Sequence, residues 1–367
     1  MSTWMIAPLL GAAIPLGALN DSPVFRVAVA IIFLGVMAFF HELGHFLAGK
    51  KFGVFVHEFG LGFGPSLVSF KLGETRYSLR LFPLGGFVRF AGEAGGGLSR
   101  EDSAVPVERH FYSQPALAKS VIVAAGPVMN LFLAAFLFFL VFSVTGLDRT
   151  TPFIGHVLPG KPAAAAGMLP GDRIVQVEGQ TIKNWEDMVS IVRRRPGLPT
   201  RFVVERDGQE LELVITPESA NGVGVIGVQS RLERSRMHPI EGIVTAFKET
   251  VYVVTFWVKG LVETVSGKAR PEVTGPVGIG QILGEAASAG ISPFLYLLGA
   301  ISANLGLINL LPIPALDGSR LLFAAIEGVR GKPVDPEKEN FIHLIGFAIL
   351  MALFVIITYR DIMRLIM

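Results

Sequence analysis

The sequence predicts an α-helical membrane protein: a bundle of about four transmembrane helices with a strand-rich region and one small α+β domain. Three observations lead to this prediction. The composition is apolar, because 51% of the 367 residues are hydrophobic and only 17% are charged, whereas soluble domains carry about 25% charged residues. Apolar segments recur that match the roughly 20 residues needed to cross a bilayer. Between two such segments, over residues 150–229, the chain becomes charged and rich in turn residues.

The composition also excludes several kinds of site. The chain has no cysteine, so thiolate metal sites, cysteine nucleophiles and disulfide bonds are excluded. A metal site must therefore be built from His, Asp or Glu. The formal net charge is only +2, and no basic cluster suggests a nucleic-acid partner, so we expect membrane lipid around the protein but no nucleic acid.

The chain begins with an apolar segment, residues 1–23, that is rich in small residues. No Lys or Arg precedes its apolar part, which is atypical of a secretory signal, and we interpret it as an N-terminal extension at or in the membrane. Asp21, Ser22 and Pro23 are typical of a helix start. The first span is predicted from Val24 to about Ala48, in a section that holds two spans over residues 24–149.

The first span contains two histidines and a glutamate at the spacing of a metal site. His41 and His45 are four residues apart, so they project from one face of a helix and can ligate one metal ion. Glu42 stands where H-E-x-x-H metalloproteases keep the base that activates water. Ionisable groups at membrane depth are costly, which makes a functional site the expected explanation.

A region rich in Gly and aromatic residues, 52–93, follows the first span. Short strands are predicted at 66–72, 75–81 and 85–90, with turns at 73–74 and 83–85. Irregular backbone is tolerated at membrane depth only where protein covers it. Two interpretations stay open: a sheet that dips into the membrane, and an ordinary cytoplasmic hairpin.

The second span is predicted over residues 121–144. Pro127 inside it predicts a kink. Asn130 either ties two helices together through hydrogen bonds or faces the active site.

Residues 150–229 predict the small α+β domain. Residues 160–179, Gly-Lys-Pro-Ala-Ala-Ala-Ala-Gly-Met-Leu-Pro-Gly-Asp-Arg-Ile-Val-Gln-Val-Glu-Gly, resemble the core of bacterial PDZ domains. A helix is predicted at 185–194, and a hairpin is predicted from 201–205 and 210–215. PDZ domains bind an extended peptide as an added strand. The alternative is a small β domain that only spaces two membrane segments.

The rest of the chain predicts a surface helix and two more spans. Within residues 230–285, an amphipathic helix is predicted on the membrane surface at 240–265, ended by Gly- and Pro-rich residues at 274–280. Within residues 286–367, spans are predicted at 292–311 and 341–357. Between these two spans, prolines 312 and 314 cannot continue a regular helix. The backbone therefore opens, which would let Asp317 turn towards a metal.

Basic residues next to the spans predict the orientation of the protein in the membrane. Nine Lys and Arg lie between residues 50 and 119, and four lie between residues 320 and 338. Both connections are therefore expected on the cytoplasmic side, with the metal site near that side. The PDZ-like domain is then outside, which is the periplasm in a Gram-negative cell.

Three patterns occur together: H-E-x-x-H in the first span, a PDZ-like insert, and Asn-x-x-Pro-x-Pro-x-Leu-Asp-Gly over residues 309–318. Together they resemble the site-2 protease family of intramembrane zinc metalloproteases, most closely bacterial regulator-of-sigma-E proteases, over about residues 24–357. The resemblance implies a Zn²⁺ ion held by His41, His45 and Asp317. It also implies that Glu42 is the catalytic base.

The resemblance further implies where substrate is handled. Gly126 and Asn130 match a family Gly-x-x-x-Asn pair implicated in substrate handling, and residues 54–90 match a membrane-associated β region that holds substrate extended. The best-known family members carry two tandem PDZ domains, so the single domain here leaves the assignment to a sigma-factor pathway open.

The expected activity is hydrolysis of a peptide bond in or near the transmembrane segment of a single-span protein in the bacterial inner membrane. The expected substrate has already been cut outside, as an anti-sigma factor or a remnant signal peptide would be. Its helix must unwind, because its amides are hidden in its own hydrogen bonds. Pairing with a strand edge that contains Gly86, Phe87 and Val88 would offset part of that cost. Asn130 or Asn309 is the expected donor to the oxyanion.

Other classes of function fit less well. A non-enzymatic scaffold that binds partners through the PDZ-like domain would not need an intact metal motif. A transporter is disfavoured because the sequence has no repeated halves. A soluble zincin is disfavoured because no downstream glutamate is placed as a ligand. The remaining histidines are scattered and receive no role: His57, His110, His156, His238 and His343.

Overall fold

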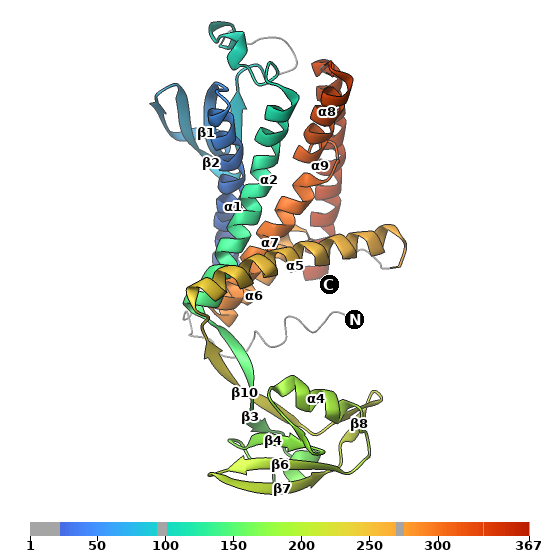
Figure 1. The fold of residues 1–367 in the computed structure, drawn as a ribbon. Coiled ribbons are helices and arrows are strands. Elements are labelled where there is room, and N and C mark those ends of the chain that lie inside the picture. Colours follow the sequence, from blue (N-terminus) through green and yellow to red (C-terminus); the bar gives the residue numbers. More distant parts are fainter. Residues whose placement is uncertain (1–22, 94–100, 269–274, 333, 367) are drawn as a thin grey trace. The chain divides into compact units, whose positions relative to one another are not determined.

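A computed structural model describes residues 23–93, 101–268, 275–332 and 334–366 (Figure 1). Apart from Pro23, the predicted N-terminal extension lies outside these described residues. The described chain forms two compact units, one over Gly146–Arg236 and one made of the chain before and after it. We describe each unit separately.

The larger unit contains the predicted membrane helices. Four of its helices are long and apolar enough to cross a membrane, over Ile31–Lys51, Ala116–Thr145, Ile291–Leu310 and Glu337–Arg364. They belong to α1 (Pro23–Lys51), α2 (Ala116–Phe139) with its π-helical end (Leu140–Thr145), α7 (Ile291–Leu310) and α9 (Pro336–Ile366). The prediction of about four spans is therefore confirmed.

The second span begins earlier than predicted, and the predicted kink at Pro127 stays a prediction. α2 begins five residues earlier than predicted and continues through Pro127 to Phe139. The helix is covered closely at this point, because a Cβ added to Gly306 of α7 would lie 2.8 Å from the Pro127 carbonyl oxygen. Close packing by a neighbouring helix allows a membrane helix to tolerate an internal proline.

The core of the bundle is apolar and brings four helices together. Met37 of α1, Leu133 of α2 and Leu298 of α7 are buried in one cluster, which also contains Leu283 of α6 (Pro276–Ala289). The sequence predicted that residues 274–280 end the amphipathic helix, and that helix does end before them, at Val265. The described part of this segment also begins a further helix, α6 at Pro276, which was not predicted.

The start of α6 is stabilised by a side chain from another helix. Proline suits the first turn of a helix, where its missing N–H would have no partner in any case. The Asp361 carboxylate of α9 accepts a hydrogen bond from the Gly278 N–H at 2.9 Å, which satisfies one of the free donors of that first turn. Gly- and Pro-rich sequence here therefore begins a helix that another helix caps.

The predicted amphipathic helix is present as α5 (Pro239–Val265). It lies across the bundle, roughly perpendicular to α1 and α2 (Figure 1). Several of its large apolar side chains are exposed, among them Ile240, Phe247 and Val265. Its location on a membrane surface stays a prediction.

The region after the first span forms two long strands instead of three short ones. β1 (Val56–Leu72) and β2 (Thr75–Phe90) meet at the predicted turn at 73–74, but residues 83–85 do not end β2. The strands fold back on each other, because Phe59 pairs with both Val88 and Tyr77. Residues 58–61 thus lie inside the sheet. Residues 86–90 form an edge with one strand neighbour among the described residues.

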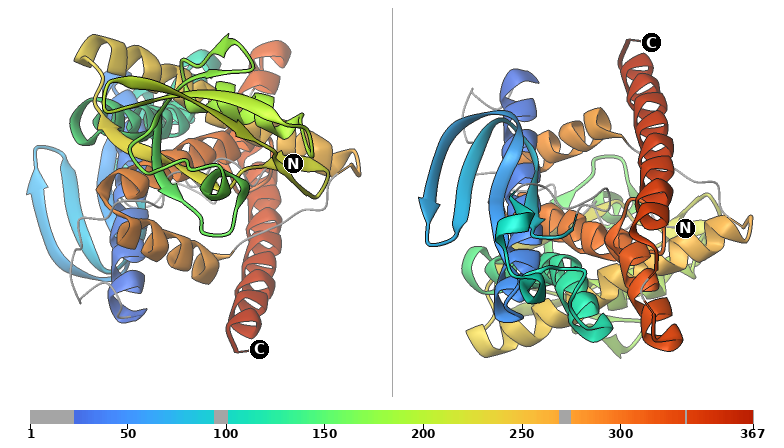
Figure 2. Two further views of the ribbon diagram at one scale, coloured as in Figure 1. Left: turned by 90° about the horizontal axis from the view of Figure 1, so that it is seen from below. Right: turned by 90° about the horizontal axis from the view of Figure 1, so that it is seen from above.

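The hairpin projects from the bundle beside α1. Both views in Figure 2 place it on the opposite side of α7 from α9. Large apolar side chains in the second half of β1 are exposed, such as Leu67, Phe70 and Leu72.

The smaller unit is an α+β domain. Five strands lie in the order β10-β3-β4-β6-β7, with bounds of Val228–Ser235, Leu147–Val157, Arg173–Val177, Thr200–Arg206 and Gln209–Ile215. The short elements are α3 (Pro162–Ala165), β5 (Gln180–Thr181), β8 (Glu218–Ala220) and β9 (Val223–Val225). Helix α4 (Trp185–Arg193) and the β6–β7 hairpin match the predicted elements.

The domain is longer than the predicted 150–229. β3 and β10 extend it at both ends, since Leu147 pairs with Ser235. The basic residues around Arg234 had no predicted element, yet Arg234 lies in β10 and pairs with Asp148 of β3 at 3.1 Å. The core includes Ile154, Met188 and Phe202. The PDZ-like character of this unit stays a prediction.

Candidate metal centre and active site

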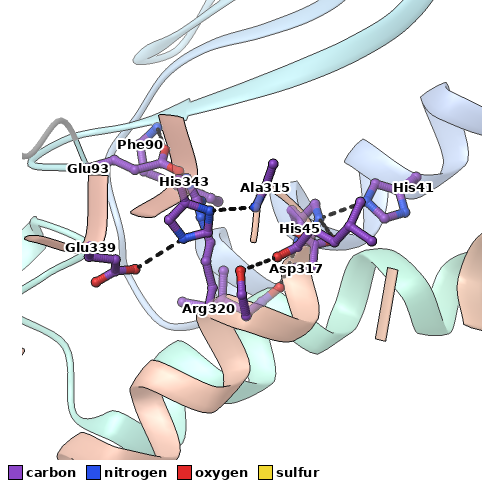
Figure 3. Close-up of polar contacts among 12 residues, drawn as sticks. His41, His45, Phe90, Glu93, Ala315, Asp317, Arg320, Glu339 and His343 are labelled. Carbon is purple, nitrogen blue, oxygen red and sulfur yellow. Dashed lines mark hydrogen bonds and ion pairs between the residues drawn. The ribbon is translucent and has the colours of Figure 1, made fainter. Parts of the chain in front are cut away.

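Three predicted ligands converge in the larger unit (Figure 3). His41 and His45 lie one turn apart on α1, and Asp317 is the first residue of α8 (Asp317–Arg330). Asp317 Oδ2 lies 3.0 Å from His41 Nε2 and 3.3 Å from His45 Nε2. The two Nε2 atoms are 3.2 Å apart. Segments more than 270 positions apart in the printed sequence thus present three ligand atoms to one point.

These distances fit a tetrahedral zinc ion. Ligand atoms at the usual zinc bond lengths of about 2.0–2.1 Å lie about 3.3 Å apart around a tetrahedral centre. Asp317 Oδ2 is buried and accepts no hydrogen bond, which leaves its lone pairs for a cation. A carboxylate oxygen with free lone pairs is one of the usual ligands of zinc.

The backbone orients the ring of His45. Its Nδ1 donates to the Ile122 carbonyl oxygen of α2 at 2.9 Å, which places the free lone pair on Nε2, facing Asp317. A hydrogen bond of this kind fixes the tautomer of a metal-ligating histidine.

Two glycines make room for this arrangement. A Cβ at Gly126 would lie 2.2 Å from His45 Nε2, and a Cβ at Gly44 would lie 2.1 Å from the Ala125 carbonyl oxygen. α1 and α2 can cross closely only because both positions lack a side chain. Gly126, predicted from the resemblance as substrate-handling, therefore has a direct steric role at the metal centre.

Asn130 of α2 orients the ring of His41. Its amide lies 3.2 Å from His41 Nδ1, and its buried Oδ1 has no hydrogen-bond partner. Rotating the amide by 180° lets Oδ1 accept from Nδ1–H, which leaves His41 Nε2 free to ligate. The Asn130 backbone carbonyl accepts from Ser302 of α7 at 2.8 Å, which holds the residue in place.

The loop before α8 positions Asp317. α7 ends at Leu310, as expected from the prolines at 312 and 314, and the Leu316 N–H donates to the Ile313 carbonyl at 3.1 Å. A Cβ at Gly318 would lie 2.2 Å from the Leu311 carbonyl oxygen, so glycine after the aspartate lets the chain turn tightly. The backbone opens after Leu310 as predicted, but Asp317 does not lie on the open segment: it is the first residue of α8 and faces the two histidines.

Glu42 lies between the ligands and the edge of β2. A Cβ at Gly86 would lie 2.9 Å from Glu42 Cγ, so glycine allows the strand to approach the glutamate. No hydrogen bond joins Glu42 to another described residue, which leaves its carboxylate free for a reacting molecule.

A cavity of about 690 Å³ opens beside these groups. Its lining includes Glu42 and the three ligands, the β2 edge with Gly86, Phe87 and Val88, and the α9 side chains of Asn340, His343, Leu344 and Phe347. An extended chain laid against the strand edge would pass Glu42 and the metal ligands.

The structure separates the predicted substrate residues into two groups. Gly86, Phe87 and Val88 line the cavity, whereas Asn130 and Asn309 are not among the described residues that line it. Arg320 forms an ion pair with Glu93 at the cavity, and no pattern in the sequence was used to predict this residue. Its position one helical turn after Asp317 was the available signal.

A His₂-carboxylate centre with an adjacent free glutamate, set in a bundle of membrane-length apolar helices, defines a membrane-embedded metallohydrolase. Comparison with known families gives the particular class. Residues 29–353 match the model of peptidase family M50. The chain belongs to this family.

Full-length relatives agree. The chain is 34% identical over 412 residues to "Zinc metalloprotease RasP" of Geobacillus kaustophilus, covering 91% of this chain and 97% of that protein. It is 32% identical over 418 residues to "Regulator of sigma-W protease RasP" of Bacillus subtilis, covering 92% of this chain and 98% of that protein. It is also 32% identical over 415 residues to "Probable protease eep" of Enterococcus faecalis, covering 91% of this chain and 98% of that protein. The protein is thus an intramembrane zinc metalloprotease of the site-2 type.

Proposed function

We propose that His41, His45 and Asp317 hold the catalytic zinc ion. The convergence of their three ligand atoms at 3.0–3.3 Å supports this assignment most directly. Zinc at this position supplies Lewis acidity, which acidifies water and polarises a carbonyl group. Ile122 and Asn130 orient the rings of His45 and His41, and the tight turn at Gly318 positions Asp317. The three donor atoms therefore stay aimed at one point.

Glu42 is the general base of the reaction. Its free carboxylate takes a proton from the attacking water, while the water oxygen bonds to the peptide carbonyl carbon. The same carboxyl then gives that proton to the departing amine when the C–N bond breaks. Because Gly86 has no side chain, Glu42 can lie directly beside the strand edge, where the scissile bond would lie.

The edge of β2 holds the substrate in an extended form. In the described chain, residues 86–90 have a strand neighbour on one side only. Gly86, Phe87, Val88 and Phe90 line the cavity. A transmembrane helix has no free amides, so an unwound substrate regains hydrogen bonds by adding to this edge. The oxyanion role expected of Asn130 or Asn309 has no support from cavity lining, since neither is part of it.

The natural substrate is a single-span protein already cut outside the membrane, such as an anti-sigma factor or a remnant signal peptide. The name of the Bacillus subtilis relative, "Regulator of sigma-W protease RasP", favours an anti-sigma factor. The protein lies in the bacterial inner membrane, with its active site near the cytoplasmic side and the PDZ-like domain outside. The basic residues beside the spans support this orientation.

The decisive experiment measures cleavage of a single-span substrate in liposomes by the wild type and by Glu42→Gln, together with the zinc content of both. We expect equal zinc and cleavage by the wild type alone, because the substitution removes the base and keeps the ligands. Equal cleavage by both proteins would exclude Glu42 as the base. Absence of zinc from both, after purification with zinc present, would exclude the ligand assignment.

A further inference from the structure

The loop that carries Asp317 contains an unusual backbone conformation. Ala315 has φ of 74°, a left-handed conformation that residues with a Cβ rarely adopt. It lies two positions before the ligand. An alanine in this conformation requires contacts from the surrounding structure that hold it there.

A side chain of the fourth span supplies such a contact (Figure 3). The Ala315 N–H donates a hydrogen bond to His343 Nδ1 of α9 at 3.1 Å. Nδ1 therefore acts as an acceptor, and the ring carries its proton on Nε2. His343 Nε2 has no hydrogen-bond partner and lies 3.8 Å from Glu339 Oε1. The bond to the loop is thus the one hydrogen bond of this ring among the described residues.

Packing holds the ring and the loop against each other. A Cβ at Gly346, one turn after His343, would lie 2.3 Å from Pro314 Cβ, so α9 and the loop touch directly. The Phe323 ring of α8 meets the His343 ring edge-on, with centroids 5.9 Å apart. The imidazole is therefore fixed between the loop and α8.

We propose that His343 is a positioning residue for the metal centre. It holds Ala315 in the left-handed conformation, and this directs Asp317 towards His41 and His45. The inference rests on the ligand set proposed above. It also gives α9 a defined role in zinc binding, although only 6% of the most apolar stretch of this helix is buried.

The test compares substitutions that keep or remove the acceptor. His343→Asn keeps an acceptor at the position of Nδ1, whereas His343→Gln moves it outward and His343→Leu removes it. Zinc affinity of the full chain in detergent is measured by competition with a chelating dye. We expect about ten- to hundred-fold weaker binding for Gln and Leu, and binding within about three-fold of the wild type for Asn.

A double substitution tests the role of the backbone. Glycine adopts φ near 74° without steric cost, so Ala315→Gly should restore much of the zinc affinity lost in His343→Leu and change the wild type little. Leu353→Ala, at an exposed position ten residues further along α9 that does not line the cavity, is the matched control and should bind zinc as the wild type does. Thermal unfolding of the zinc-free proteins shows which variants are folded.

The outcomes are distinct. Wild-type affinity in all three His343 variants overturns the positioning role and leaves the ligand set intact. Equal loss in Asn, Gln and Leu also overturns it, because the acceptor would then not matter. A wild type that binds no zinc overturns the proposed ligand set instead. If His343→Leu does not fold, the comparison of His343→Asn with His343→Gln decides the question.

Discussion

At the scale of single residues, the proposed metal centre depends on three ligand side chains and on the glycines and hydrogen bonds that hold them in place. The helical spacing of His41 and His45 predicted two of the ligands, and the resemblance, together with the prolines before Asp317, predicted the third. The close approach of Gly44 to Ala125, and of His343 to Ala315, depends on where helices cross. No local pattern in the sequence determines those crossing points, so the orienting residues emerge only from the assembled bundle.

Gly126 provides a test at this scale. Gly126→Ala puts a Cβ where His45 Nε2 lies, 2.2 Å away, so the ring must move from its ligand position. We expect zinc affinity to fall about ten- to hundred-fold, measured by chelator competition. Gly328→Ala is the control, because its nearest neighbour would be 3.7 Å away. An unchanged zinc affinity with weaker substrate binding would return Gly126 to the substrate-handling role that the resemblance implied.

At the scale of elements, the hairpin shows how local reading of strands fails. Pro83 and Gly85 are typical of a turn, yet β2 continues through them because residues 56–61 pair with 86–90 and hold the far end in the sheet. The turn at 73–74 was predictable because Gly73 adopts the positive φ that a tight turn requires, at 62°. Long-range strand pairing therefore determines the structure at residues 83–85, whereas local conformation determines the turn at 73–74.

Ion pairs hold the turn between β1 and β2 in place, which gives a pH-dependent prediction. Arg109 donates to both oxygens of Glu74 at 2.8 and 2.9 Å, and Lys50 also pairs with it. Arg109, and after it Lys50, outweigh burial and lower the pKa of Glu74 from 4.5 to about 2. Because the folded-state pKa is the lower one, this carboxylate stabilises the fold fully above pH 4.5 and loses its effect as the pH falls towards 2.

We therefore expect Glu74→Gln to lower the free energy of unfolding by a constant amount above about pH 5, and by a shrinking amount between about pH 4.5 and 2. Denaturant unfolding of both proteins in detergent across this range measures the difference. A difference that stays constant down to pH 2 would contradict the ion-pair explanation.

At the scale of the whole molecule, the fold class and the site could be predicted because membrane length and ligand spacing are both local properties. The bounds of the inserted domain could not, since the ends of β3 and β10 are polar and have no recognisable pattern. Their pairing, with Leu147 opposite Ser235, shows where the domain can be removed.

Deleting residues 147–235 and joining the neighbours by a short Gly-Ser linker should leave zinc content unchanged, because every proposed ligand lies in the other unit. Cleavage of trimmed and untrimmed substrates then defines the domain's role. Faster cleavage of untrimmed substrate identifies a size filter, and slower cleavage of both identifies a docking module. Loss of zinc on deletion would show instead that the membrane unit depends on the domain for its structure.

In the proposed function, the edge of β2 would recognise a peptide through its main chain, which is the same in every protein. Such an edge imposes little preference for particular side chains around the scissile bond. The rate of cleavage is then governed by how readily a substrate helix comes apart. Glycine or proline near the cut weakens a helix, so unrelated membrane proteins that share a fragile helix become substrates of one enzyme.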